Sequence, residues 1–206
     1  MDWTEPLVAA GIAVGAYLIG SFPSAYLVGR YRAGVDIRTA GEGNVGARNA
    51  FHVVGRRWGV VVWALDVAKG AVVAIPLLDG QTWKLAVAVV FLILGHAYPV
   101  WLGFVGGKGL AAAGGFAAAL MPLAALMAGG ACGLVWLVTR RFLPTVVTVV
   151  VLTFAFAPLT GVRWSTMGVA LGGFVLTAVK RIVDEPRMRR IEAETGWDRT
   201  AGGSRT

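Results

Sequence analysis

The chain is poor in charged side chains, which make up only 15% of its 206 residues. A soluble domain carries about 25% charged residues and about 45–50% apolar ones. Here 57% of the residues are hydrophobic and the mean hydropathy is +0.70. This composition excludes an ordinary soluble enzyme and predicts an integral membrane protein. The length allows a single domain and no sizeable soluble module beside it.

Residues that bind metals or form crosslinks are also scarce. Cys132 is the only cysteine, so no disulfide can form within the chain, and there are only two histidines. Structural zinc sites use four ligands, chiefly Cys and His, so we predict no metal site. No arrangement of Ser, His and Asp for nucleophilic catalysis is recognisable. The first residues include Asp2 and Glu5 and no basic segment, which argues against a cleaved signal peptide.

Apolar runs occupy most of the chain. A helix needs about 20 apolar residues to cross a membrane, and fewer where protein shields its ends. We predict an all-α membrane domain with seven transmembrane helices and a polar cytoplasmic tail at 182–206. Pro122 divides an apolar stretch that is too long for one helix. The predicted spans lie at about 7–29, 58–78, 85–102, 110–121, 123–138, 143–159 and 164–179.

Positive charge is distributed unevenly around these spans. The net charge is +8, and sixteen of the 19 lysines and arginines fall on one side. Lys84 and Arg163 fall on the other side, and Lys69 lies inside a span. Because basic loops stay in the cytoplasm, we predict an outside N-terminus and a cytoplasmic C-terminus. Since the basic residues flank apolar segments, topology and anionic lipid explain them better than nucleic acid does.

Two glycine-rich segments lie on the predicted cytoplasmic side. The first, Gly41–Asn49, reads GEGNVGARN, and the second, Gly106–Gly109, reads GGKG. Glycine lets backbone N–H groups approach an anion closely, and a nearby lysine or arginine adds charge and donors. The GxxxxGK[ST] spacing of a P-loop is absent. We predict a site for phosphate-bearing molecules, with a solvated loop and a flexible turn as the alternatives.

Asp66 and Lys69 lie within the second predicted span, three residues apart on one helix face. Ionisable residues inside a membrane are costly, so they are functional candidates by default. A structural ion pair that locks helices together is the alternative. Both roles coexist if Lys69 also faces an anionic ligand. His96, near the end of the third span, is as consistent with a packed side chain as with a catalytic one.

These motifs, in this order and spacing, resemble the bacterial acyl-phosphate-dependent glycerol-3-phosphate acyltransferase family (PlsY). The similarity covers about 20–181, most of the chain. It implies a seven-span enzyme of the bacterial inner membrane with its site facing the cytoplasm. Such an enzyme moves a fatty acyl group from acyl phosphate to the 1-hydroxyl of glycerol 3-phosphate, without a metal or other cofactor. The implied partners are these two substrates and membrane lipid, with no nucleic acid.

The resemblance also implies site residues. It makes Lys108 a catalytic candidate, and Glu42 and His52 are further catalytic candidates as the general base, a role that would suit a different acceptor. We expect acyl phosphate at Lys108 and its flanking glycines, and glycerol 3-phosphate at the first loop and Lys69. The candidate substrate-binding residues are Arg38, Gly43, Asn44, Gly46, Arg48, Asn49, Asp66, Lys69, His96, Gly106, Gly107 and Gly109.

The chain departs from the family pattern at several of these positions. The family has a serine at Glu42, a threonine at Arg48 and an arginine at His52, and its C-terminal His and Asn are absent here. Arg48 and His52 would share a helix face, so we expect Arg48 to replace the lost cation. We also expect Arg48, six residues after Glu42 in a folded loop, to neutralise that carboxylate. The sequence does not decide whether the acceptor is glycerol 3-phosphate or a related polyol phosphate. A divergent, non-catalytic homologue that binds phosphorylated lipid or a partner protein is the alternative.

Overall fold

The computed structural model describes residues 4–78, 81–139, 142–198 and 203–204. It is helical, as predicted, apart from two short antiparallel strands, β1 (Trp197–Asp198) and β2 (Gly203–Ser204). Three 3₁₀ turns are present: η1 (Ile75–Leu77), η2 (Val100–Leu102) and η3 (Ala157–Thr160). The α-helices are α1 (Thr4–Ser21), α2 (Ser24–Ala33), α3 (Ala47–Val53), α4 (Arg56–Ala74), α5 (Thr82–Ala97), α6 (Leu110–Leu120), α7 (Pro122–Thr139), α8 (Phe142–Phe156) and α9 (Trp164–Thr195).

Four helical stretches are long and apolar enough to cross a membrane: Thr4–Ala33, Arg56–Leu77, Thr82–Leu102 and Trp164–Thr195. Three shorter apolar helices lie at Leu110–Leu120, Pro122–Val138 and Thr145–Thr160. Apolar helices therefore occupy all the segments that the sequence analysis assigned to spans. The seven-span count and the orientation of the termini stay predictions.

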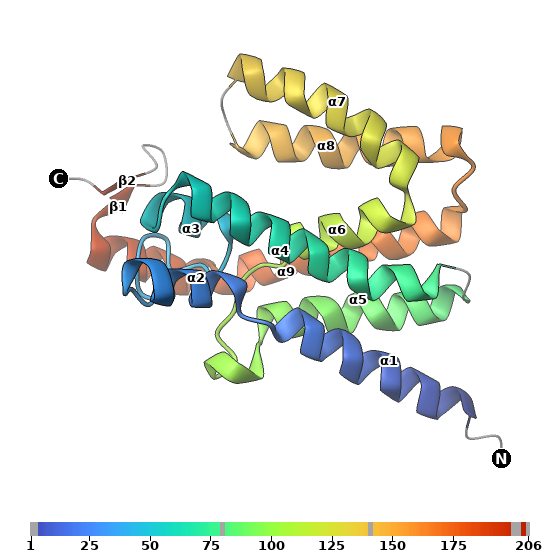
Figure 1. Cartoon of the computed structure of the whole chain (residues 1–206), viewed down its shortest axis with the longest axis horizontal. Helices are drawn as coiled ribbons and strands as arrows, with labels where there is room; N and C mark the ends of the chain where they lie inside the picture. The colour runs from blue at the N-terminus through green and yellow to red at the C-terminus, as the bar shows by residue number, and fades with distance from the viewer. Residues whose placement is uncertain (1–3, 79–80, 140–141, 199–202, 205–206) are drawn as a thin grey trace.

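The first long stretch is broken at Pro23. Proline has no N–H to donate and crowds the residue before it, so a helix cannot continue through it undisturbed. Accordingly α1 ends at Ser21 and α2 begins at Ser24 in a different direction (Figure 1). The break leaves the Phe22 carbonyl outside any helical ladder, and Lys69 Nζ of α4 donates to it at 2.6 Å.

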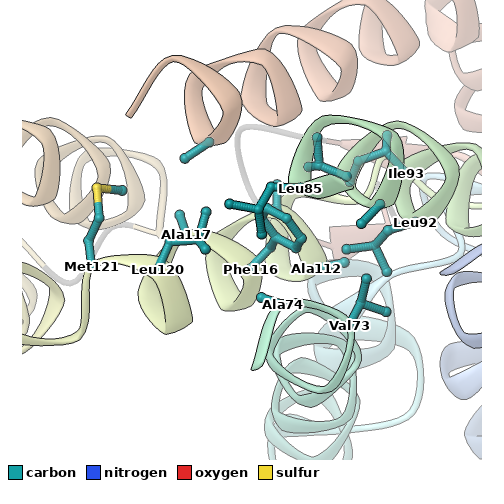
Figure 2. Close-up of a cluster of buried hydrophobic side chains, with 14 of the residues drawn as sticks. Val73, Ala74, Leu85, Leu92, Ile93, Ala112, Phe116, Ala117, Leu120 and Met121 are labelled. Carbon is teal, nitrogen blue, oxygen red and sulfur yellow. The ribbon is translucent and has the colours of Figure 1, made fainter. Parts of the chain in front are cut away.

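The central bundle consists of α1, α4, α5, α6 and α9, with α7 and α8 forming a separate hairpin beside it (Figure 1). Glycines allow its helices to approach closely. A Cβ at Gly70 of α4 would collide with the Ala112 carbonyl of α6, and one at Gly95 of α5 with the Tyr17 carbonyl of α1. Such small residues at helix contacts are typical of membrane bundles. Figure 2 shows the buried apolar cluster around Phe116.

Helix α9 differs most from the prediction. The last span was expected to end at 179, with a polar tail from 182, but the helix continues to Thr195 through Pro186. The extension packs against the rest of the protein because its buried side chains recur every three or four residues on one face. These are Lys180, Asp184, Met188 and Ile191.

Candidate active site

The two glycine-rich loops meet in the structure. A Cβ on Gly107 of the second loop would collide with the carbonyl of Val45 in the first loop. A Cβ on Gly106 would collide with the backbone carbonyl of His96, at the end of α5. Only glycine therefore lets the second loop lie between the first loop and α5. Both loops were predicted to belong to one site, and the contact of Gly107 with Val45 brings them together.

Asn49 of α3 holds the first loop in shape. Its side chain is fully buried, and its Oδ1 accepts the backbone N–H of Glu42 at 3.1 Å. Gly41 and Gly43 have φ values of +59° and +66°, a region that glycine enters easily. The Nδ2 of Asn49 donates to three carbonyl oxygens, those of Ile37, Ala40 and Asn44, at 2.9–3.0 Å. The amide predicted to bind substrate is thus occupied by the loop itself.

Glu42 is the most unusual residue of the first loop. Its side chain is 2% exposed, and its Oε2 lies 3.4 Å from Nη1 of Arg48, as the sequence analysis expected. Its Oε1 is buried and accepts no hydrogen bond from any described residue, and the same holds for Oδ1 of Asn44. Buried polar atoms are normally paired. Two unpaired acceptors in one loop therefore indicate a place for hydrogen-bond donors of a ligand.

His52 lies at the rim of this site. The residue is exposed, but its ring packs edge-to-face against Trp197, with 5.5 Å between ring centres. This partial burial lowers the pKa of His52, the charge of Arg48 lowers it further, and Glu42 opposes the shift. Both effects favour the neutral imidazole. Arg48, not His52, supplies the cation of this helix face.

Arg38 joins the segment before the first loop to η2, which precedes the second loop. Its Nη2 lies 2.6 Å from Oδ2 of Asp36, and its Nη1 donates to the carbonyl of Leu102 at 3.1 Å. The side chains of Arg38 and Asp36 remain 30% and 28% exposed. The hydrogen bond from Arg38 lowers the pKa of the Asp36 carboxyl. Asp36 and Leu102 therefore occupy donors of the guanidinium that the sequence analysis predicted for substrate.

Asp66 and Lys69 form the buried ion pair that their spacing predicted. Lys69 Nζ lies 2.7 Å from Asp66 Oδ1, and the side chains are 7% and 1% exposed. Lys69 Nζ also donates to Ser24 Oγ at 3.0 Å, besides the Phe22 carbonyl. The pair joins α4 to the break between α1 and α2. A small cavity beside it is lined by Lys69, His96 and Val45 among others, which places it under the first loop.

Helix α9 crosses both loops. Near the middle of the helix, Thr177 lies against Gly109 of the second loop. At its end, Ile191 packs on Gly43, and Thr195 Oγ1 donates to the Gly41 carbonyl at 3.1 Å. In Figure 1 the C-terminal end of α9 gathers with α2 and α3 at the same end of the molecule. The stretch of α9 between these contacts therefore faces the junction of the two loops.

That stretch carries Lys180, Asp184 and Arg187, which the sequence analysis did not assign to the site. Lys180 is 6% exposed, with its Nζ 2.6 Å from Asp184 Oδ1 and 4.5 Å from the centre of the Tyr98 ring. Oδ2 of Asp184 and Nη2 of Arg187 are buried without a hydrogen-bond partner among the described residues. The spacing of these residues, four and then three, places them on one helix face and was the available signal. It was missed because the last membrane span was expected to end at 179, which left these residues in the polar tail.

Comparison with known proteins shows the family of the chain. The family model described as glycerol-3-phosphate acyltransferase matches residues 10–189. The chain belongs to the glycerol-3-phosphate acyltransferase family. It is 36% identical over 201 residues to a glycerol-3-phosphate acyltransferase of Synechococcus elongatus, an alignment that covers 90% of this chain and 93% of that relative.

Other members of the family match over a shorter region. Glycerol-3-phosphate acyltransferase 5 of Dehalococcoides mccartyi is 44% identical over 128 residues, 60% of this chain and 54% of that protein. A glycerol-3-phosphate acyltransferase of Anaeromyxobacter dehalogenans is 46% identical over 127 residues, 58% of this chain and 63% of the relative. The match thus spans between half and two thirds of these two relatives.

A solved family member has the same fold. The crystal structure of PlsY (YgiH), an integral membrane glycerol 3-phosphate acyltransferase in its glycerol 3-phosphate form, superposes with a TM-score of 0.74 at 29% identity. The superposition covers 96% of this chain and 95% of that one. Together with the apolar helices, this identifies the chain as a multi-pass integral membrane protein.

Proposed function

We propose that this chain transfers a fatty acyl group from acyl phosphate to glycerol 3-phosphate or a related polyol phosphate. The product would be lysophosphatidic acid or its analogue, for phospholipid synthesis. The observation that carries the proposal is the meeting of the two glycine-rich loops under the charged face of α9. We place the enzyme in the bacterial inner membrane with seven spans. Its site faces the cytoplasm, because most of the basic residues lie on the same side of the membrane as the two glycine-rich loops.

The second loop is the proposed donor site. Lys108 is half-buried between Gly107 and Gly109, and α6 begins directly after Gly109. Backbone N–H groups of a glycine-rich turn and of a helix amino end bind phosphate well. Lys108 then neutralises charge that develops on the phosphate oxygen as it leaves. Preorganised donors of this kind stabilise a transition state strongly where water is excluded.

The first loop and α9 form the proposed acceptor site. Three buried oxygens have no donor in the described chain, on Glu42, Asn44 and Asp184. Hydroxyl groups of a polyol would supply those donors. Arg48 and Arg187 provide cations for a phosphate group of the same molecule. Asn49, Arg38 and the Asp66–Lys69 pair then serve mainly to position these groups.

The reaction needs no covalent enzyme intermediate, because phosphate is a good leaving group. The acceptor hydroxyl oxygen attacks the acyl carbon, and the bond from that carbon to the phosphate oxygen breaks. The electron pair leaves with phosphate, and the hydroxyl proton passes to Oε1 of Glu42 or to a phosphate oxygen. Glu42 is the better base than His52 here, since its Oε1 is buried and unpaired while the His52 ring packs on Trp197.

The test is phosphate release by the purified protein from a long-chain acyl phosphate in the presence of glycerol 3-phosphate. Lys108→Ala should lower kcat by roughly a hundredfold or more, because the loss of one positioned donor at a developing negative charge lowers kcat by about that factor. Lys108→Arg, which keeps the charge, is the matched control and should retain more activity. Binding of acyl phosphate without turnover by the unmodified protein, with every polyol phosphate tried, would favour the non-catalytic alternative.

A further inference from the structure

A cluster of two arginines and a tryptophan lies outside the candidate active site. Cζ of Arg32 lies 4.2 Å from the centre of the Trp58 ring, and Cζ of Arg57 lies 5.5 Å from the same ring. Arg32 belongs to the last turn of α2 and Arg57 to the first turn of α4. Two guanidinium groups from different helices thus share one indole.

The positive charge of this cluster is not neutralised within the described part of the chain. Arg32 and Arg57 are both exposed, and neither forms an ion pair with a described residue. The carboxylate of Asp36, which follows α2, is already bound by Arg38. Two like charges on one ring repel each other, and an anion between them would relieve the repulsion.

Helix stability does not explain why arginines stand here. The first turn of α4 contains Arg56 and Arg57, with no acidic residue and no side-chain cap. A cation near the amino end of a helix opposes the helix dipole and destabilises the helix by several tenths of a kcal/mol. The placement is therefore unfavourable for α4 itself, and it becomes favourable once an anion is bound.

An apolar surface continues from the cluster along α4. Val60 is 56% exposed and Trp63 is 51% exposed, and they lie three and six residues after Arg57, along one side of α4. In a membrane this face meets the acyl chains of lipid. A molecule with its charged end at Arg32 and Arg57 would therefore lay its hydrocarbon along Val60 and Trp63. That combination is the chemistry of a phospholipid.

We propose that Arg32, Arg57 and Trp58 bind the phosphate of an anionic phospholipid of the bilayer. Arginine suits this role because its planar guanidinium forms paired hydrogen bonds to phosphate while it stacks on an aromatic ring. Basic residues beside a membrane span attract anionic lipid in general. The shared indole makes this a defined site, because it fixes the two guanidiniums relative to each other. The bound lipid would link α2 to α4 and stabilise the fold.

The competing explanation is that these arginines only set the topology of the protein. Topology depends on charge and not on the shape of the cation. Replacing both residues in R32K/R57K keeps the charge and removes the planar, stacked groups. R189K/R190K is the matched control, because those arginines are 75% and 73% exposed and lie near Glu185 and Glu194.

The experiment measures lipid binding to the full-length protein in detergent by native mass spectrometry. Phosphatidylglycerol and phosphatidylcholine with identical acyl chains, and lysophosphatidic acid, are added separately. We expect the unmodified protein to retain one phosphatidylglycerol and to prefer it over phosphatidylcholine. R32K/R57K should weaken phosphatidylglycerol binding roughly fivefold or more, and R32Q/R57Q by more than tenfold. R189K/R190K should bind as the unmodified protein does.

Acyl-transferase activity without added lipid should be the same in all four proteins, which verifies that the variants are folded. Two results would overturn the proposal. One is equal retention of phosphatidylglycerol by the unmodified protein and R32K/R57K. The other is binding of lysophosphatidic acid without binding of phosphatidylglycerol, which would make the cluster a product site instead of a bilayer-lipid site.

Discussion

Replacing Asn49 distinguishes a loop-positioning residue from a substrate ligand. Asn49→Ala removes the acceptor of the Glu42 N–H. It also removes the NH₂ group that donates to the carbonyl oxygens of Ile37, Ala40 and Asn44. The NH₂ group has two hydrogens, so about three hydrogen bonds are lost, each worth about 1 kcal/mol net. We expect a loss of about 3 kcal/mol, concentrated in the first loop, and a fall in kcat/KM of roughly a hundredfold as Glu42 moves.

The sharper comparison is Asn49→Asp, which keeps the shape of the side chain. Its carboxylate would face three carbonyl oxygens that have lost their donor, so it should be less stable and less active than Asn49→Ala. Thermal unfolding in detergent and steady-state kinetics measure both effects. If Asn49 were instead a substrate ligand, Asn49→Ala would raise KM and leave the melting temperature unchanged. That result would refute the positioning role.

Three further predictions concern the titratable residues Glu42, Lys69 and His52. Glu42→Ser should raise affinity for glycerol 3-phosphate if Glu42 only repels phosphate, or abolish turnover if it is the base; unchanged kinetics would place it outside the site. Lys69→Met should destabilise the protein by about 3–5 kcal/mol by leaving Asp66 buried without its cation, whereas K69M/D66N should recover part of the loss in thermal unfolding. Because the folded-state pKa of His52 is lowered, its stabilising contribution is present above pH 6.5 and is lost as pH falls through the folded-state value. His52→Gln should therefore lose less thermal stability than the unmodified protein between pH 7 and pH 5.

Short-range features of the fold could be predicted from the sequence. The apolar runs predicted the positions of the long helices, because a helix needs about 20 apolar residues to cross a membrane, or fewer where protein shields its ends. Pro23 marked the break after α1, since proline cannot continue a helical ladder. Asp66 and Lys69 lie on consecutive turns of one helix, and Arg48 is six residues from Glu42, so both ion pairs follow from local spacing.

Other features were decided only by the tertiary structure, because their partners are far apart in the chain. Nothing in the GEGNVGARN segment shows that Asn49 serves three carbonyls of its own loop, or that Gly107 must lie against Val45. The composition after 179 reads as a polar tail. Packing against Gly43 and Gly41 gives that segment a buried face, so the helix persists to Thr195 and brings its charged residues over the loops. A local pattern specifies an element, but a site assembled from residues up to 154 positions apart depends on how the elements pack.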